Sequence, residues 1–312
     1  MQLLRFFPGM LVGIASTLSL SACAAASEPA TDPAQTSRID AAFPPSAWPQ
    51  ACEDWDEWDK PGPPFALASS DSFYVGTCGI AAILIDSGEG LILIDSGTDA
   101  GADVVLANIA ALGFDPADVK LILTSHEHFD HIGGVAKIQQ ATGAELVTSQ
   151  AAAEVFTSGE VSPEDPQFGT IDGVKPARVD RIVGNGDVVE LGNKRLVATA
   201  TPGHTHGALS WSWQGCDEDG KCRTIVYADS LSPVSSDSYR FSDHPDYLAA
   251  YREAIAREAA LDCDVLVTPH PSASEMRDKL LAGGIASGMN CAQYAASITE
   301  RLDARLAEEH RP

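Results

Sequence analysis

The sequence predicts an α/β protein with two packed sheets at its core and helices on the outside. Short apolar runs of the length of buried strands recur between turn residues such as Gly, Asn and Asp. Helical stretches separate these runs, and the alternation occurs in two similar halves. This pattern is typical of layered α/β domains.

Each expected element follows from its apolar pattern and from the turn residues that bound it. In chain order we expect strands at 73–77, 81–86 and 91–95, a helix at about 100–112, a strand at 120–125, a helix at 132–143 ended by Gly143, and a strand at 145–149. The second half then gives strands within 181–204, at 208–213 and at 224–229, a helix at 247–258, a strand at 264–270 and a helix from Ala292.

The N-terminal segment 1–23 has the features of an export signal. Its apolar run from Met10 to Leu20 is too short to span a bilayer. The string "LSAC" resembles a bacterial lipobox, in which Cys23 is lipidated and becomes the mature N-terminus. The alternative is ordinary cleavage after an Ala-x-Ala site such as Ala24–Ala26, which would leave a soluble protein. We therefore expect a periplasmic protein, anchored to the outer membrane through Cys23 if the lipobox is used.

After the signal, composition separates a tether from a folded domain. Residues 24–48 are rich in Ala, Ser, Thr and Pro and predict a disordered tether, whereas 49–312 predict one catalytic domain. The formal charge of −24 makes nucleic acid and anionic membrane surfaces poor partners. We expect a monomer that acts on a small molecule. An anionic substrate would need local positive charge, which a metal can supply.

Of the seven cysteines, six remain after Cys23, an even number in a chain expected to be exported. Six cysteines allow 15 pairings. Locality favours Cys216–Cys222, and the pairs that we then suggest are Cys52–Cys78 and Cys263–Cys291.

Histidines follow three of the expected strands, in "TSHEHFDH" (124–131), "TPGHTHG" (201–207) and "VTPH" (267–270). If these strand ends share one edge of the core, six side chains can meet there. Neutral imidazole and carboxylate are the ligands that zinc accepts outside thiolate sites. The candidate ligands are His126, His128, Asp130, His131, His204 and His270.

The order His-x-His-x-Asp-His, then Gly-His, then a strand-end histidine resembles the signature of the metallo-β-lactamase superfamily, over nearly all of the chain from Trp48 onward. The resemblance implies an αββα sandwich of two related halves with a dinuclear zinc site on one edge. It implies that a first zinc ion is held by His126, His128 and His204, and a second by Asp130, His131 and His270.

The strings "YVGT", "TPGHTHG", "YADSLSP" and "TPHPSASE" resemble the third subclass of metallo-β-lactamases, which has a serine, here Ser230, where other subclasses have a zinc-binding cysteine. Some of its members have three disulfides paired as above. The resemblance implies resistance to penicillins, cephalosporins and carbapenems, because a metal-bound hydroxide hydrolyses the β-lactam amide bond. Asp130 would bind metal and orient that nucleophile.

Four other side chains are candidates for contacts with the substrate. We expect Ser230 and Ser232 to donate hydrogen bonds to its carboxylate, with a plain loop role as the alternative. Tyr239 is a candidate donor to the developing oxyanion, although a packed loop tyrosine fits equally well. Gln167 lies in the polar stretch 157–170, a candidate to overhang the site.

Two aspartates are candidates for supporting roles. Asp95, at the end of "LILID", is a candidate to hold a ligand histidine, or is a simple turn residue. Near Asp229, related lactonases and thioester hydrolases have an aspartate that bridges two metals, so this residue separates the lactamase from a lactone or thioester hydrolase. A third hypothesis is a non-enzymatic zinc-binding lipoprotein. The role of His206 stays open.

Overall fold

The computed structural model describes residues 42–53 and 57–311. The predicted export signal, with Cys23, and most of the predicted tether lie outside these ranges. Within the described ranges, no helix combines the length and the apolar character needed to cross a membrane.

The first of two sheets has seven strands. Their order across the sheet is β1 (Phe65–Ala66), β2 (Ser72–Tyr74), β3 (Ile83–Asp86), β4 (Leu91–Ile94), β5 (Val119–Leu123), β6 (Glu145–Thr148) and β7 (Arg181–Ile182). The β1–β2, β2–β3 and β3–β4 pairs are antiparallel, and the β4–β5, β5–β6 and β6–β7 pairs are parallel. The carboxyl ends of β4, β5 and β6 therefore lie at the same edge of this sheet.

The second sheet has five strands. Their order is β12 (Val265–Val267), β11 (Cys222–Tyr227), β10 (Leu209–Cys216), β9 (Lys194–Ala200) and β8 (Val188–Leu191). All neighbours are antiparallel except β11 and β12, which are parallel. The predicted strands at 208–213, 224–229 and 264–270 correspond to β10, β11 and β12.

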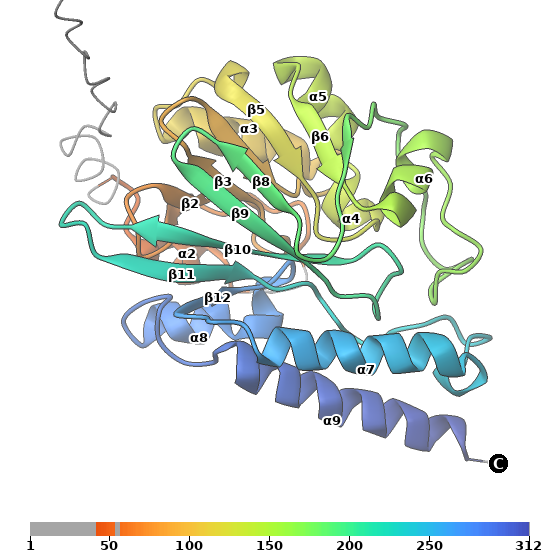
Figure 1. Ribbon diagram of the computed structural model, residues 1–312. Helices are drawn as coiled ribbons and strands as arrows, with labels where there is room; N and C mark the ends of the chain where they lie inside the picture. The colour runs from red at the N-terminus through yellow and green to blue at the C-terminus, as the bar shows by residue number, and fades with distance from the viewer. Residues whose placement is uncertain (1–41, 54–56, 312) are drawn as a thin grey trace, which may run out of the picture.

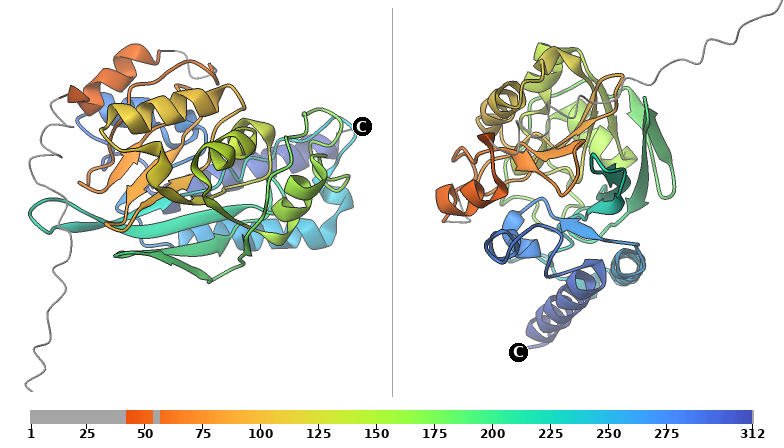
Figure 2. Two further views of the ribbon diagram at one scale, coloured as in Figure 1. Left: turned by 90° about the horizontal axis from the view of Figure 1, so that it is seen from above. Right: turned by 90° about the vertical axis from the view of Figure 1, so that its left-hand side faces the viewer.

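Helices cover the outer faces of both sheets (Figures 1 and 2). The first sheet is covered by α3 (Gly101–Ala111) and α5 (Val135–Thr142), and the second by α7 (Pro245–Ala259) and α9 (Cys291–Glu309), which pack against each other. This arrangement confirms the predicted α/β sandwich. Shorter helices are η1 (Pro45–Ala47), α2 (Trp48–Ala51), η2 (Pro116–Asp118), α4 (Phe129–Ile132), α6 (Gln150–Ser158), η3 (Phe241–Asp243), η4 (Pro271–Ser274) and α8 (Met276–Leu281).

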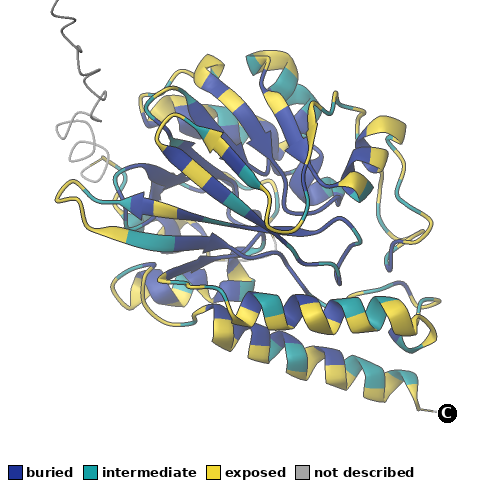
Figure 3. Ribbon diagram, viewed as in Figure 1, coloured by how far each residue is buried: buried dark blue, intermediate teal, exposed yellow. Residues whose placement is uncertain are grey.

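The apolar runs of the sequence fill three layers, because the central strands are buried on both faces (Figure 3). In β3, Ile83 and Ile85 pack between the sheets with Trp211 of β10, whereas Leu84 points to the helices over the first sheet. Side chains of a strand alternate between its faces, so a strand covered on both faces is apolar at every position.

Two predicted boundaries are wrong. The tether predicted to reach residue 48 ends earlier, since Pro45–Ala47 are helical and Trp48 is buried edge-on against Tyr74. The predicted helix 132–143 is two helices, α4 and α5, separated at Gly133 and Gly134. A β-carbon at Gly134 would lie 2.6 Å from the Ala102 side chain of α3, so this close approach requires glycine.

The three predicted disulfides are confirmed. Cys52–Cys78 joins the end of α2 to the loop after β2, and Cys216–Cys222 closes the β10–β11 hairpin. Cys263–Cys291 joins the segment before β12 to the first residue of α9. The last bridge therefore fixes the beginning of α9 against the second sheet.

Glu258 of α7 is a carboxyl group that the fold buries at an energetic cost. Glu258 of α7 is fully buried, and within the described part of the chain neither of its carboxyl oxygens has a hydrogen-bond partner. Burial raises the pKa of Glu258 to about 7. In the unfolded chain the group ionises nearer pH 4.5, so the folded state loses stability from this group as pH rises from that value through 7.

We predict that Glu258→Gln stabilises the fold at pH 8 by about 2 kcal/mol and much less at pH 5, because only the ionised carboxylate is penalised by burial. Urea denaturation at both pH values measures the difference. Glu253→Gln, at an exposed position of the same helix, is the matched control. Equal effects of Glu258→Gln at the two pH values would contradict the buried-charge explanation.

Candidate metal centre

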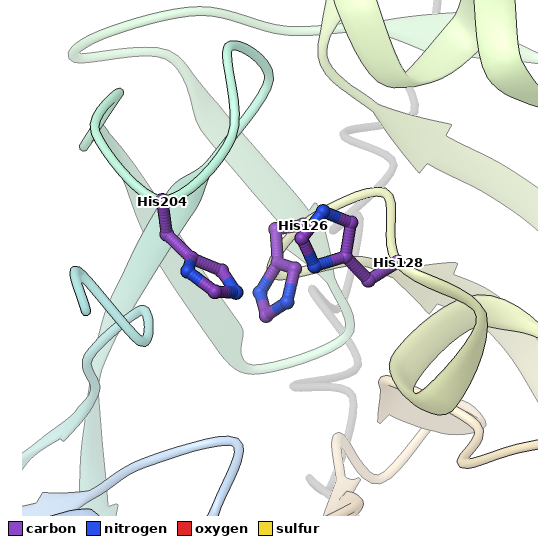
Figure 4. A group of neighbouring side chains, drawn as sticks. All are labelled: His126, His128 and His204. Atoms are coloured by element: carbon purple, nitrogen blue, oxygen red, sulfur yellow. The ribbon is translucent and has the colours of Figure 1, made fainter. Parts of the chain in front are cut away.

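Three loops that follow strands of both sheets meet at one edge of the sandwich. The loop after β5 carries His126 and His128, the loop after β9 carries His204, and His270 follows β12. The ligand nitrogens of His126, His128 and His204 all lie within 4.8 Å of one another. Their imidazoles point toward a common centre (Figure 4), with ring centroids 4.7–5.0 Å apart.

Each of these three imidazoles uses one nitrogen to donate to an oxygen outside the group. His126 Nδ1 donates to Asp229 Oδ1 at 2.8 Å, and His128 Nε2 donates to Asp165 Oδ2 at 3.0 Å. His204 Nδ1 donates to the Ser232 carbonyl at 2.9 Å. Such bonds fix the tautomer and the orientation of a ligand histidine and leave its other nitrogen as an acceptor.

The acceptor nitrogens fit a cation. His126 Nε2 is buried and has no hydrogen-bond partner among the described residues. Burial, followed by the neighbouring imidazoles, holds the pKa of His126 well below its usual range, and the same causes act on His204. Both rings are therefore neutral near pH 7, the form that binds a metal.

A second group adjoins the first. His131 Nε2 lies 3.0 Å from Asp130 Oδ2, and His270 Nε2 lies 3.3 Å from the same oxygen. The two Nε2 atoms are 3.2 Å apart. Although burial raises the pKa of Asp130, the imidazoles of His131 and His270 hold it well below its usual range. His126 also lies within 4.8 Å of Asp130 and His131, so it stands between the two groups.

Both groups open into one cavity of about 480 Å³. Three of the four predicted substrate contacts line it: Ser230, Ser232 and Gln167, the last from the loop after α6. The Ser230 hydroxyl is buried and has no hydrogen-bond partner among the described residues. The Ser232 hydroxyl lies 3.1 Å from His204 Nδ1. The cavity wall is completed by Trp58, Phe129, Ile171, Val234, Ser272, Ala273 and Arg301.

Residues 75–270, which hold all six candidate ligands, match the family model described as the metallo-beta-lactamase superfamily. The chain belongs to the metallo-beta-lactamase superfamily. The solved structure of the MIM-2 metallo-beta-lactamase is 53% identical, with a TM-score of 0.79, and the match covers 85% of this chain and 98% of that one. MEM-A1, a subclass B3 metallo-beta-lactamase from a soil metagenome library, is 40% identical, with a TM-score of 0.77, over 81% and 98% of the two chains.

Other members of the superfamily match over a shorter range. A hydroxyacylglutathione hydrolase of Rhodopseudomonas palustris (strain BisB18) is 34% identical over 145 residues, which is 45% of this chain and 46% of that protein. The chain spans about half the length of the curated relatives it matches. The two metallo-beta-lactamase structures thus match a larger part of this chain than the hydroxyacylglutathione hydrolase does.

Glu127, inside the "HEHFDH" string, holds two loops of the centre together, a role that the sequence did not reveal. Glu127 accepts hydrogen bonds from Thr205 Oγ1 at 2.7 Å and from the Gly207 amide at 2.8 Å. It therefore ties the loop with His126 and His128 to the loop with His204. A β-carbon at Gly207 would lie 2.7 Å from the Glu127 carboxylate, which explains the glycine there.

Asp165 is a second residue whose role at the centre the sequence did not predict. One of its carboxylate oxygens accepts a hydrogen bond from His128, and the other accepts one from the backbone N–H of Gln167 at 2.7 Å. Asp165 thus connects a candidate ligand to the turn that carries Gln167 into the cavity. Nothing in the local sequence singles it out, because it lies 37 residues from His128 in a stretch rich in acidic and turn residues.

Asp95 supports the centre in a different way from the one predicted. Its Oδ2 lies 3.9 Å from His131 Nδ1, too far for a hydrogen bond. Instead the carboxylate accepts from the Ser125 amide at 2.7 Å, the Ser125 hydroxyl at 2.6 Å and the Tyr227 hydroxyl at 2.8 Å. Asp95 therefore fixes the backbone directly before His126 rather than a ligand ring.

Tyr239 is not among the residues that line this cavity; its ring stacks on His244, with centroids 4.5 Å apart, as expected for a packed loop tyrosine. It lines a separate groove that also contains His206. His206 donates from Nε2 to the Glu164 carbonyl at 3.1 Å and stacks on Tyr247. His206 therefore holds the loop after α6, which answers the question that the sequence left open.

We predict that Glu127→Ala lowers metal affinity by about 10- to 100-fold, since the His204 loop loses its bond to the neighbouring loop. Calorimetric titration of the protein with metal measures the change in affinity. Glu154→Ala, which removes an exposed carboxylate from α6, is the control. Unchanged affinity in Glu127→Ala would show that His204 keeps its position without this carboxylate.

Proposed function

We propose that the protein is a periplasmic, monomeric, two-zinc β-lactamase that hydrolyses the amide bond of penicillins, cephalosporins and carbapenems. The match over 98% of the MIM-2 and MEM-A1 metallo-beta-lactamases supports this assignment. The three disulfides support an oxidising compartment. The observation that carries the proposal is the position of Asp229, which is a hydrogen-bond partner of His126 rather than a member of either ligand group.

The donors of both groups fit zinc. Neutral imidazole nitrogens and one carboxylate, with no thiolate, are zinc ligands, and three ligands per ion leave positions open for water and substrate. His126, His128 and His204 would hold one ion, and Asp130, His131 and His270 the other. When bound, such a pair supplies Lewis acidity and a hydroxide nucleophile near neutral pH.

The chain's own groups have complementary roles in this proposal. Asp130 is ionised, lines the cavity and orients the attacking water through its carboxylate. The Ser230 hydroxyl, which lacks a partner within the described residues, donates to the substrate carboxylate, and Ser232 lies beside it on the same wall. Gln167 closes the cavity from the loop after α6.

The second candidate, a thioester or lactone hydrolase, is favoured by the partial match to hydroxyacylglutathione hydrolase. It requires an aspartate that bridges both metals. Asp229 Oδ1 accepts from His126 Nδ1, and its Oδ2 accepts from the Leu231 amide at 3.1 Å, so both oxygens are already used within the protein. A non-enzymatic zinc-binding protein fits less well, because structural zinc sites are closed by four ligands.

We predict that the metal-loaded protein contains about two zinc ions per chain and hydrolyses a chromogenic cephalosporin, and that a chelator abolishes this activity until zinc is restored. Elemental analysis and absorbance assays on the same samples measure both quantities. Full activity with one zinc per chain would contradict the two-metal proposal. Activity that survives chelation would contradict any metal-dependent reaction.

Three substitutions distinguish the two enzyme hypotheses. In the β-lactamase, Asp229→Asn keeps both zinc ions, and Ser230→Ala mainly raises KM because it removes a contact present in ground state and transition state alike. Asp130→Ala lowers kcat severely, because a ligand and the orienter of water are lost together. Zinc content and β-lactam kinetics measure these effects. Loss of zinc in Asp229→Asn, with unchanged kinetics in Ser230→Ala, would favour the thioester or lactone hydrolase.

A further inference from the structure

One cationic side chain stands at the wall of the cavity. Arg301 of α9 lines it together with Ser230 and His270, and among the described lining residues it is the only lysine or arginine. The chain as a whole carries a formal charge of −24. Arg301 is therefore the one fixed cationic side chain that these lining residues offer to an anion, in a chain that is otherwise acidic.

Among the described residues, none pairs with the guanidinium of Arg301. Other arginines near this end of the molecule are engaged: Arg305 pairs with Glu309 at 3.2 Å and donates to the Ser235 hydroxyl, and Arg252 pairs with Asp303 at 2.8 Å. Within the part of the chain that the structure describes, Arg301 has no ion-pair or hydrogen-bond partner of this kind. Its donors therefore remain available at the cavity.

The helix that carries Arg301 is fixed relative to the substrate side of the cavity. Tyr294, two turns earlier on the same face of α9, donates its hydroxyl to the Asp229 and Ser230 carbonyls. The Cys263–Cys291 disulfide holds the first residue of this helix. The base of the Arg301 side chain thus has a set position with respect to Ser230.

We propose that Arg301 recognises the negative charge of the substrate by binding its carboxylate at the cavity wall. The proposal rests on the proposed function, because β-lactam antibiotics carry a carboxylate on the carbon next to the ring nitrogen. A guanidinium presents a planar pair of donors that match a carboxylate. Since Arg301 is exposed to solvent, its attraction is screened by salt. Arg301 is thereby a specificity-determining residue for acidic over neutral substrates.

The test uses the zinc-loaded protein and two chromogenic cephalosporins, one with a free carboxylate and one in which that group is a neutral methyl ester. For Arg301→Gln we expect kcat/KM on the acid to fall about 5- to 20-fold, mostly through KM, with little change on the ester. Arg301→Lys should recover part of the loss, because it keeps the charge without the planar fork. Added salt should reduce the acid rate of the wild type more than that of Arg301→Gln.

Arg252→Gln, which removes an arginine outside the cavity, is the control and should leave both substrates unaffected. Equal losses on acid and ester in Arg301→Gln would indicate a structural role and overturn the inference, as would unchanged kinetics on both. If the zinc-loaded wild type hydrolyses neither cephalosporin, the proposed function fails, and this inference fails with it. A wild type that is active, with no acid-specific loss in Arg301→Gln, refutes the inference alone.

Discussion

The metal centre depends on a constraint between the two sheets: ligands from both must stay at a fixed separation. Glu127 meets this constraint directly, since its carboxylate joins the loop after β5 to the loop after β9. Two further bonds act at the same place, from Leu209 to the Ser125 carbonyl at 2.7 Å and from the Trp211 indole to the Thr124 carbonyl at 2.9 Å. These bonds are buried, so breaking one would leave an unpaired polar group away from water. This cost keeps the two sheets in a fixed position relative to each other at the metal centre.

The same region buries an unusual amount of acid. Three carboxylates, those of Asp130, Asp165 and Asp229, touch histidines of the two groups, and Glu127 and Asp95 lie directly behind them. Burial of so many acids near one another is unfavourable unless cations balance them. Lysine and arginine are absent from the described residues of the ligand groups, and burial keeps His126 and His204 neutral, so these two rings supply no charge. Although burial lowers the pKa of His131, the Asp130 carboxylate raises it above its usual value, so this one ring offsets only part of the acid. The electrostatic balance therefore favours a centre that binds metal cations.

The ligand set could be predicted from the sequence because its spacing is local and its residue types are rare. His126, His128 and His131 lie within one short string, and His204 and His270 each follow a strand that the sequence predicts. Glu127 and Asp165 were not predictable, since their partners lie 78 and 37 residues away and acidic residues are common in loops. The two roles proposed for Tyr239 could not be separated for a related reason: the partner of an aromatic ring, here His244, is set by the three-dimensional packing and not by the local sequence.

The candidate ligands and the proposed substrate contacts come from different segments of the chain. The loop after β5 and helix α4 contribute His126, Asp130 and His131, and later segments add His204 and His270, whereas Ser230 and Arg301 of α9 line the proposed substrate side. Asp229 connects the two sides, with its carboxylate on His126 and its carbonyl on Tyr294 of α9. A change at the wall can therefore alter which substrates bind without moving a ligand, provided that the buried bonds of Asp229 are kept. In the role proposed for Arg301, selectivity is adjustable at an exposed position, while most of the candidate ligands are constrained by burial.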